Sequence, residues 1–151
     1  MSIYRVDKTE LPVVLFHSDG SVLKGVVFLS ASAYSHIGRQ TLSDLLLDRE
    51  DFFPFRSETG EFSVINRDTV THIRYEPLSK DEELLVIGTP VDVQINFIGG
   101  EQLRGTILIE SREGRTRLSD FINTTKKFFT VSSGATRYLV NLGHIRNIGV
   151  C

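Results

Sequence analysis

The side chains best suited to chemistry form a basic cluster in the second half of the sequence. Arginine and lysine side chains bind phosphate groups, and aromatic rings stack on nucleobases. Two adjacent phenylalanines, Phe128 and Phe129, directly follow the cluster. The pattern predicts an anion-binding or nucleic-acid-binding loop, and its alternative interpretation is a solvated loop beside two core phenylalanines. The cluster consists of Arg112, Arg115, Arg117, Lys126 and Lys127.

No motif in the sequence indicates catalysis. A phosphate loop ending in Gly-Lys-Ser/Thr, a Gly-x-Ser-x-Gly elbow and a His-Glu-x-x-His zinc motif are all missing. The four histidines are dispersed and the single cysteine is Cys151, so neither a metal site nor a cofactor is expected. The pairs Ser43-Asp44 and Ser119-Asp120 recur beside apolar residues, which favours capping of a helical turn over a nucleophile. We therefore expect a protein that is not an enzyme.

The composition is that of an ordinary folded protein. The chain has 151 residues, 40% hydrophobic and 24% charged, far from the composition of disordered sequences. Its net charge of −2 and pI near 6.1 argue against a surface that binds nucleic acid all round. No apolar run approaches the ~18 residues of a membrane span, and residues 1–8 have charges where a secretory signal is apolar. We expect a cytoplasmic protein without a membrane partner.

The elements that must position these residues occur twice, because the sequence contains an internal repeat. Residues 12–30 match residues 90–111, and further blocks follow in the same order. The aligned blocks are Leu23-Lys24-Gly25 with Leu103-Arg104-Gly105, Leu42-Ser43-Asp44 with Leu118-Ser119-Asp120, Phe52-Phe53 with Phe128-Phe129, and Asn66 with Asn141. The sequence thus predicts a first domain at 1–76, a linker rich in acidic residues at 77–89, and a second domain at 90–151.

Within each copy the hydrophobic pattern is that of short strands. Apolar and polar residues alternate over 91–97, which places the apolar set on one face of a half-buried strand. Gly25 and Gly105 lie inside strands and predict a strong bend in each. We expect an all-β protein of two tandem small barrels, each with about five strands and at most one helical turn.

The bent strands around Gly25 and Gly105 are followed by a pattern apolar-apolar-Asn-x-x-x-apolar-x-x-Ile at 64–73 and 139–148. Together these features resemble the Sm-like (Lsm) small-barrel superfamily, and the Leu-Ser-Asp block followed by Phe-Phe looks like that of an uncharacterised bacterial group with this barrel. The resemblance implies assembly into rings through edge strands. In RNA-binding members it implies a uridine pocket built from an Asp-x-x-x-Asn and an Arg-Gly element. Here Asn66-Arg67 and Asn141-Leu142 stand at the Arg-Gly position, and the loops at 31–40 and 112–117 lack the other element.

The two copies differ in charge. Residues 11–76 contain 6 Lys and Arg against 9 Asp and Glu, whereas residues 90–151 contain 8 against 5. Opposite net charges on similar modules favour contact between a first and a second copy. We therefore interpret the protein as an assembly or protein-interaction module that forms a ring or a head-to-tail oligomer or binds another protein. The alternative is RNA or nucleotide binding through the basic cluster.

Overall fold

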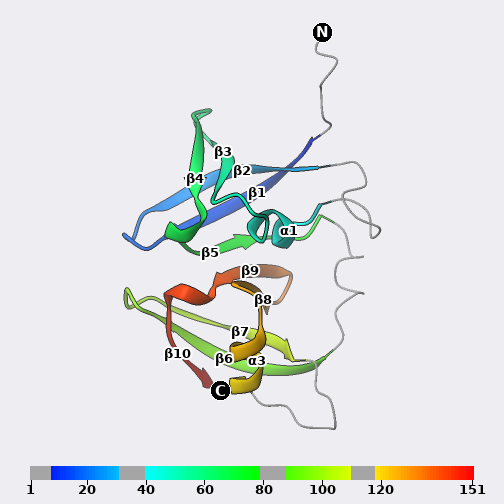
Figure 1. The fold of residues 1–151 in the computed structure, drawn as a ribbon, viewed down its shortest axis with the longest axis vertical. Coiled ribbons are helices and arrows are strands. Elements are labelled where there is room, and N and C mark those ends of the chain that lie inside the picture. The colour runs from blue at the N-terminus through cyan, green and yellow to red at the C-terminus, as the bar shows by residue number, and fades with distance from the viewer. Residues whose placement is uncertain (1–7, 31–39, 79–87, 110–117) are drawn as a thin grey trace.

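A computed structural model describes residues 8–30, 40–78, 88–109 and 118–151. The ranges up to residue 78 are called the first half below, and those from residue 88 the second half. The expectation of an all-β protein is confirmed, and each half contains five strands (Figure 1). The first half comprises β1 (Lys8–His17), β2 (Val22–Ser30), α1 (Leu42–Leu46), β3 (Phe52–Ser57), β4 (Phe62–Asn66), η1 (Arg67–Thr69) and β5 (Val70–Tyr75). The second half comprises β6 (Thr89–Phe97), β7 (Gln102–Ile109), α3 (Leu118–Thr124), β8 (Phe128–Ser133), β9 (Thr136–Asn141), η2 (Leu142–His144) and β10 (Ile145–Val150).

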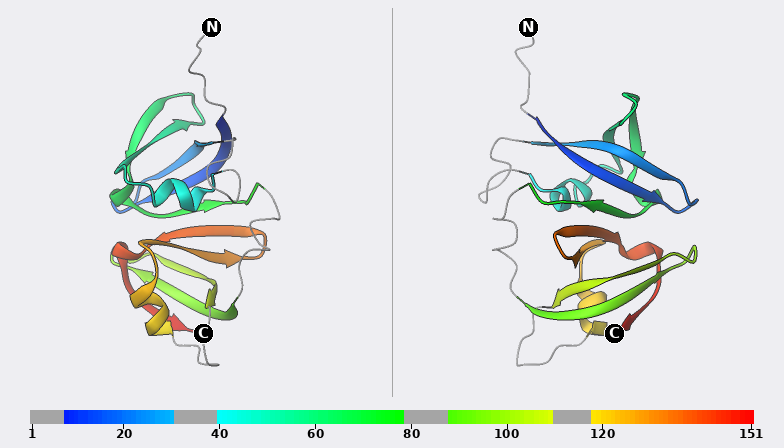
Figure 2. Two further views of the ribbon diagram at one scale, coloured as in Figure 1. Left: turned by 45° about the vertical axis from the view of Figure 1, so that its right-hand side comes forward. Right: turned by 180° about the vertical axis from the view of Figure 1, so that it is seen from behind.

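The ten strands form one open antiparallel sheet. Its order is β10-β6-β7-β8-β9-β5-β1-β2-β3-β4, so each half contributes five consecutive strands and the halves meet where β9 pairs with β5. Figure 2 shows the two halves stacked along the long axis, with β5 and β9 facing each other between them. Separate closure of each half into a barrel stays a prediction.

The alternation over 91–97 places its apolar side chains inward as predicted. Val93, Ile95 and Phe97 are all buried.

The buried apolar residues form two clusters, one centred on each half. The first contains Leu11, Val13, Leu15, Val27, Leu29, Leu42, Leu46, Phe53, Phe55, Ile65, Val70, Ile73, Phe128 and Leu139. The second contains Val93, Ile95, Phe97, Ile107, Ile109, Phe129, Val131 and Val140.

Gly25 and Gly105 occupy the same place in the two halves, where the second strand of each half crosses the third. A Cβ on Gly25 would lie against the carbonyl oxygen of Arg56 and 2.6 Å from the ring of Phe55. A Cβ on Gly105 would lie 2.5 Å from Val131 Cγ1 and 2.7 Å from the Ser132 carbonyl oxygen. Only glycine permits this close approach of the strands.

We expect Gly25→Ala to lower the free energy of unfolding by about 1–3 kcal/mol, because the added methyl group overpacks the contact with β3. Chemical denaturation of the purified variant measures this loss. The matched control is Gly149→Ala in β10, where an added Cβ meets nothing within 4 Å and stability should stay the same or rise slightly. Equal stabilities of the two variants would contradict the close approach at Gly25.

The helices differ from the prediction in the residue that caps α1 and in the length of α3. Ser43 does not cap α1. Thr41 does, because Thr41 Oγ1 accepts from Asp44 N at 3.1 Å and the Asp44 carboxylate accepts from Thr41 N at 2.9 Å, a reciprocal capping box. Ser119 likewise lies inside α3, which at seven residues exceeds the single turn expected.

No helix in the described ranges has the length and the apolar composition of a membrane span.

Candidate assembly interface

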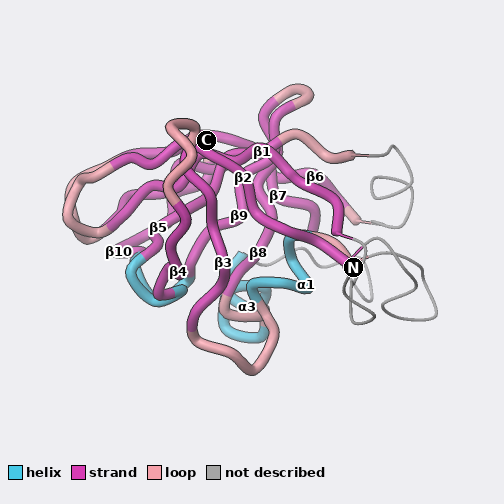
Figure 3. The backbone as a smooth tube through the Cα atoms, turned by 90° about the horizontal axis from the view of Figure 1, so that it is seen from above, coloured by secondary structure: helices cyan, strands magenta, loops and turns pink. Residues whose placement is uncertain are grey.

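The two halves are joined through a strand pair, which we call the internal interface together with the side chains packed on it. Strands β5 and β9 run antiparallel, with His72 opposite Val140, Ile73 opposite Leu139, Arg74 opposite Tyr138 and Tyr75 opposite Arg137. Viewed along the long axis in Figure 3, α1 and α3 lie on the same side of the molecule. The halves are therefore related like successive units of an array, because the second half presents its fourth strand, β9, to β5, the fifth strand of the first half.

Two side chains of the second half complete the core of the first. Phe128 of β8 and Leu139 of β9 belong to the first core cluster, beside Val70 and Ile73 of β5. Phe128 is 2% exposed and Leu139 is fully buried. Because a buried side chain of this size contributes about 1.5–3 kcal/mol relative to an exposed one, these contacts stabilise the interface strongly.

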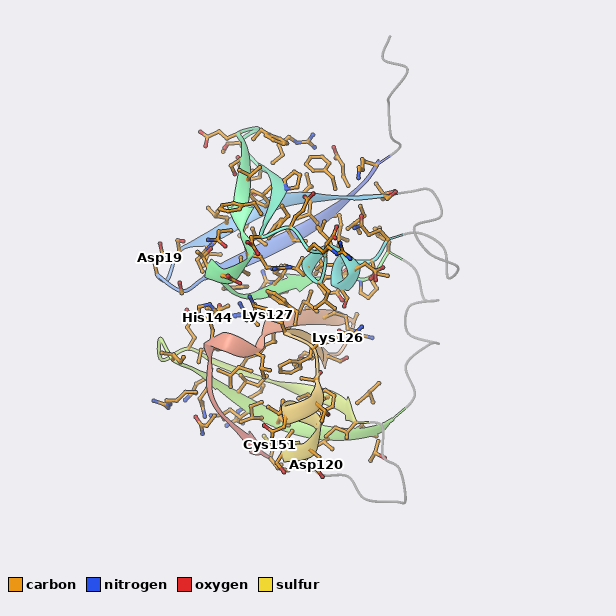
Figure 4. All side chains as sticks on the ribbon, in the orientation of Figure 1. Asp19, Asp120, Lys126, Lys127, His144 and Cys151 are labelled. Atoms are coloured by element: carbon orange, nitrogen blue, oxygen red, sulfur yellow. The ribbon has the colours of Figure 1, made fainter. Side chains whose placement is uncertain are left out.

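Polar contacts fix the alignment of the halves. Asn141 Nδ2 donates a hydrogen bond to the Val70 carbonyl oxygen at 2.9 Å, and His144 Nε2 donates to the Asp68 carbonyl oxygen at 2.5 Å. Lys127 forms an ion pair with the Asp68 carboxylate. Figure 4 shows Lys127 and His144 at the junction of the halves. The hydrogen bond from Lys127 lowers the pKa of Asp68 below its ordinary value.

A stack of rings also crosses the internal interface. The ring of His72 in β5 lies 4.2 Å from that of Phe16 and 4.8 Å from that of Phe97 in the second half. Thr71 Oγ1 donates its proton to the Phe16 carbonyl oxygen at 3.0 Å. Because a hydroxyl has a single proton, Thr71 Oγ1 accepts the hydrogen bond from His72 Nδ1, which lies 2.9 Å away. Burial, with a smaller contribution from the positive charge of Arg74, lowers the pKa of His72 to about 4. His72 is therefore neutral near pH 7.

The predicted basic cluster divides between different environments. Arg112, Arg115 and Arg117 lie outside the described residues. Lys126 is exposed, whereas Lys127 takes part in the internal interface. Phe128 and Phe129 are both buried, so neither presents a ring on which a base could stack. Sequence reasoning had not connected Lys127 or Phe128 with contact between the halves.

Each end of the sheet is a strand that has a neighbour on one side only. Strand β4 ends the sheet on the side of the first half and β10 ends it on the side of the second, and they lie towards opposite ends of the molecule in Figure 1. Both strands expose large apolar side chains, Phe62 and Val64 on β4 and Val150 on β10. The free edge of such a strand is a template for pairing with another strand. We call β4 and β10 the open edges.

The open edges are the counterparts of the strands that meet in the internal interface. Asn66 and Asn141 end β4 and β9 and cap η1 and η2 in the same way, each accepting a backbone N–H through Oδ1. Phe52 lies opposite Asn66 as Phe128 lies opposite Asn141, so Phe52 is the counterpart of Phe128. Phe52 is 51% exposed, and Val64, the counterpart of Leu139, is 60% exposed. The same positions are therefore covered in one half and uncovered in the other.

Two further surface features are the hollows beside Gly25 and Gly105. A groove of about 810 Å³ lies beside Gly25, and its charged lining residues are Lys24, Arg56, Glu58, Arg74 and Glu76. The guanidinium of Arg56 pairs with Glu10 at 2.6 Å. A smaller hollow of about 410 Å³ lies beside Gly105. Because a hollow lies beside each of the two glycines, we relate both hollows to the close approach of neighbouring strands there.

The described residues contain no group of three or more His, Cys, Asp and Glu side chains that could hold a metal ion. His17 is buried, with Nδ1 3.3 Å from Thr69 Oγ1, and burial lowers its pKa.

Comparison of the chain with protein-family models, curated proteins and solved structures finds no match.

Proposed function

We propose that the protein is a non-enzymatic assembly module, built of two tandem Sm-like small barrels, that associates with further copies of itself through its open edges. The observation that carries this proposal is the contrast between matching positions. The second half covers β5 of the first half with Phe128 and Leu139, while Phe52 and Val64 at the matching positions of the first half remain half exposed or more.

The composition of the open edges supports the proposal. Natural sheets commonly protect their edges with charged residues or proline. Strand β4 instead alternates exposed Phe62 and Val64 with Ser63 and contains no charged residue. Strand β10 contains one, Arg146. Burying each large apolar side chain contributes about 1.5–3 kcal/mol, so covering several of them favours association.

Light scattering coupled to size exclusion, over a range of concentrations, tests the proposal. We expect masses that are multiples of the 17.0 kDa chain. Val64→Lys should weaken association about tenfold or more, because it removes apolar contact and places a charge on the edge. The matched control is Val22→Lys, which changes an exposed valine on β2, a strand with neighbours on both sides, and should leave association unchanged.

Two outcomes would overturn the proposal. One is a protein that stays monomeric at every concentration. The other is a monomer with excess absorbance at 260 nm that high salt removes, because that result indicates bound nucleic acid instead of self-association.

A further inference from the structure

We propose that the groove beside Gly25 is a second contact surface, which binds the same groove of another copy of the chain across a two-fold axis. Its apolar floor, which we call the groove floor, consists of Pro12 and Val14 of β1 and Val26 of β2. Strands β1 and β2 have neighbours on both sides in the sheet. The contact is therefore made by a face of the sheet, and it goes beyond association through the open edges.

The groove floor belongs to the outer face of the first half. Strand β1 contributes buried side chains to the first core cluster from one face, and Pro12 and Val14 to the groove from the other. Val14 and Val26 are half-buried, and Pro12, directly opposite Val26, is exposed. Every residue of the stretch 11–16 is apolar, which is typical of strands that are covered on both faces. The outer face of β1 thus has the composition of a covered surface.

The second half presents the matching face in a form suited to water. The counterparts of the groove floor, aligned through Gly25 and Gly105, are the polar residues Asp92, Gln94 and Thr106. Thr106 Oγ1 donates to the Asp92 carboxylate at 2.7 Å, and Arg104 Nε donates to the side-chain oxygen of Gln94 at 2.9 Å. The same place in the fold is therefore polar and hydrogen-bonded in one half and apolar in the other, which favours contact of the groove floor with another apolar surface.

The groove also has two exposed charges of each sign that take no part in an ion pair. Lys24 and Arg74 lie on either side of Val14, because both stand opposite it in the strand register. Glu58 and Glu76 line the same groove. All four side chains are exposed, and none of them forms an ion pair within the part of the chain that the structure describes.

This balance of charge points to a second copy of the chain as the partner. In a two-fold contact a patch meets itself, so each positive side chain needs a negative one within the same patch. A partner of one charge sign would instead favour a groove of the opposite sign. The guanidinium of Arg56, which also lines the groove, is already paired with Glu10. The two groove floors then cover each other, while the two positive side chains of each copy meet the two negative ones of the other.

Exchange of charges tests the contact in a Val64→Lys background, in which association through the open edges is weakened. One variant, Lys24→Glu with Arg74→Glu, makes the four groove charges negative, and the other, Glu58→Lys with Glu76→Lys, makes them positive. By light scattering we expect the background chain to have twice the 17.0 kDa mass. Each variant alone should dimerise at least about tenfold more weakly, because like charges meet. An equal mixture of the two variants should form a mixed dimer, identified by native mass spectrometry.

A matched pair of substitutions tests the groove floor. Val14→Gln should also weaken dimerisation about tenfold, and the second half already accepts glutamine at this place as Gln94. The control is Val22→Gln, whose counterpart is Gln102, because Val22 is exposed on β2 outside the groove. This variant should dimerise like the background chain.

Three results would overturn the inference. They are equal weakening by Val14→Gln and Val22→Gln, charge variants that form no mixed dimer, and a Val64→Lys background chain that is monomeric, which would leave the groove to a different molecule. The proposed function fails separately, if Val64→Lys leaves the association of the unsubstituted protein unchanged.

Discussion

Replacing Phe128 by alanine is expected to lower the free energy of unfolding by about 3–5 kcal/mol. Phe128 is 2% exposed and belongs to the core cluster of the first half although its strand belongs to the second. The substitution leaves a cavity between the halves, so both core clusters should lose stability together. Urea denaturation followed by far-ultraviolet circular dichroism measures the loss.

The matched control is Phe52→Ala, because Phe52 is the counterpart of Phe128 in the first half. At protein concentrations low enough to keep the chain monomeric, its substitution should change stability by less than about 0.5 kcal/mol, since the side chain is half exposed. Phe128→Leu provides a milder variant if Phe128→Ala does not fold. Equal losses for Phe128→Ala and Phe52→Ala would contradict the burial of Phe128 between the halves.

Acid should destabilise the protein through His72 in a defined pH window. The unfolded chain takes up a proton at this histidine near pH 6.5, whereas the folded protein takes it up only near pH 4, because burial disfavours the imidazolium ion. The stability gained by keeping His72 neutral is therefore complete above about pH 6.5. It decreases as the pH falls and is lost below about pH 4. The difference amounts to about 3 kcal/mol at 1.36 kcal/mol for each pKa unit.

His72→Phe isolates this contribution, because it retains an aromatic ring between Phe16 and Phe97 and removes the titrating group. The free energy of unfolding, measured at intervals from pH 7.5 to pH 4, should fall less steeply for the variant than for the unsubstituted protein. The carboxylates of the chain titrate in both proteins and cancel in the comparison. Parallel profiles would contradict a neutral, buried His72.

The apolar periodicity and the repeat were sufficient to predict the strands, because both depend on local sequence. Alternation over 91–97 predicted the inward face of β6, and the repeat predicted the same order of elements in both halves. Gly25 and Gly105 marked the close strand crossings, since a glycine inside a strand is costly without such a reason. Five strands in each half followed from these local patterns.

The helix caps were harder to predict, because several residues competed for one role. Ser43 has the right side chain for a cap but lies one residue inside α1. Thr41 precedes the helix, and Asp44 three residues later completes the capping box. The spacing of Thr41 and Asp44 is the capping-box signal, whereas the repeated Ser-Asp pairs lie inside the helices.

The basic cluster shows how one residue type can serve two purposes. The sequence places Lys127 in the predicted anion-binding cluster, but its ammonium group pairs with Asp68 across the internal interface. The opposite net charges of the two copies pointed in this direction, since they favour contact between a first and a second copy. Charge totals do not identify the partners, because these residues are 59 positions apart in the sequence.

By itself, the sequence determined the strands, their inward faces, the glycines at the close strand crossings and the equivalence of the two copies, because local side-chain patterns encode all of these. Only the tertiary structure decided which copy covers which. Phe52 and Phe128 are equivalent in the repeat, yet Phe52 is half exposed and Phe128 is buried in a core. The physical reason is that burial depends on the neighbouring strand, and the pairing of β5 with β9 joins segments far apart in the chain through complementary side chains. That single pairing leaves β4 and β10 as the open edges.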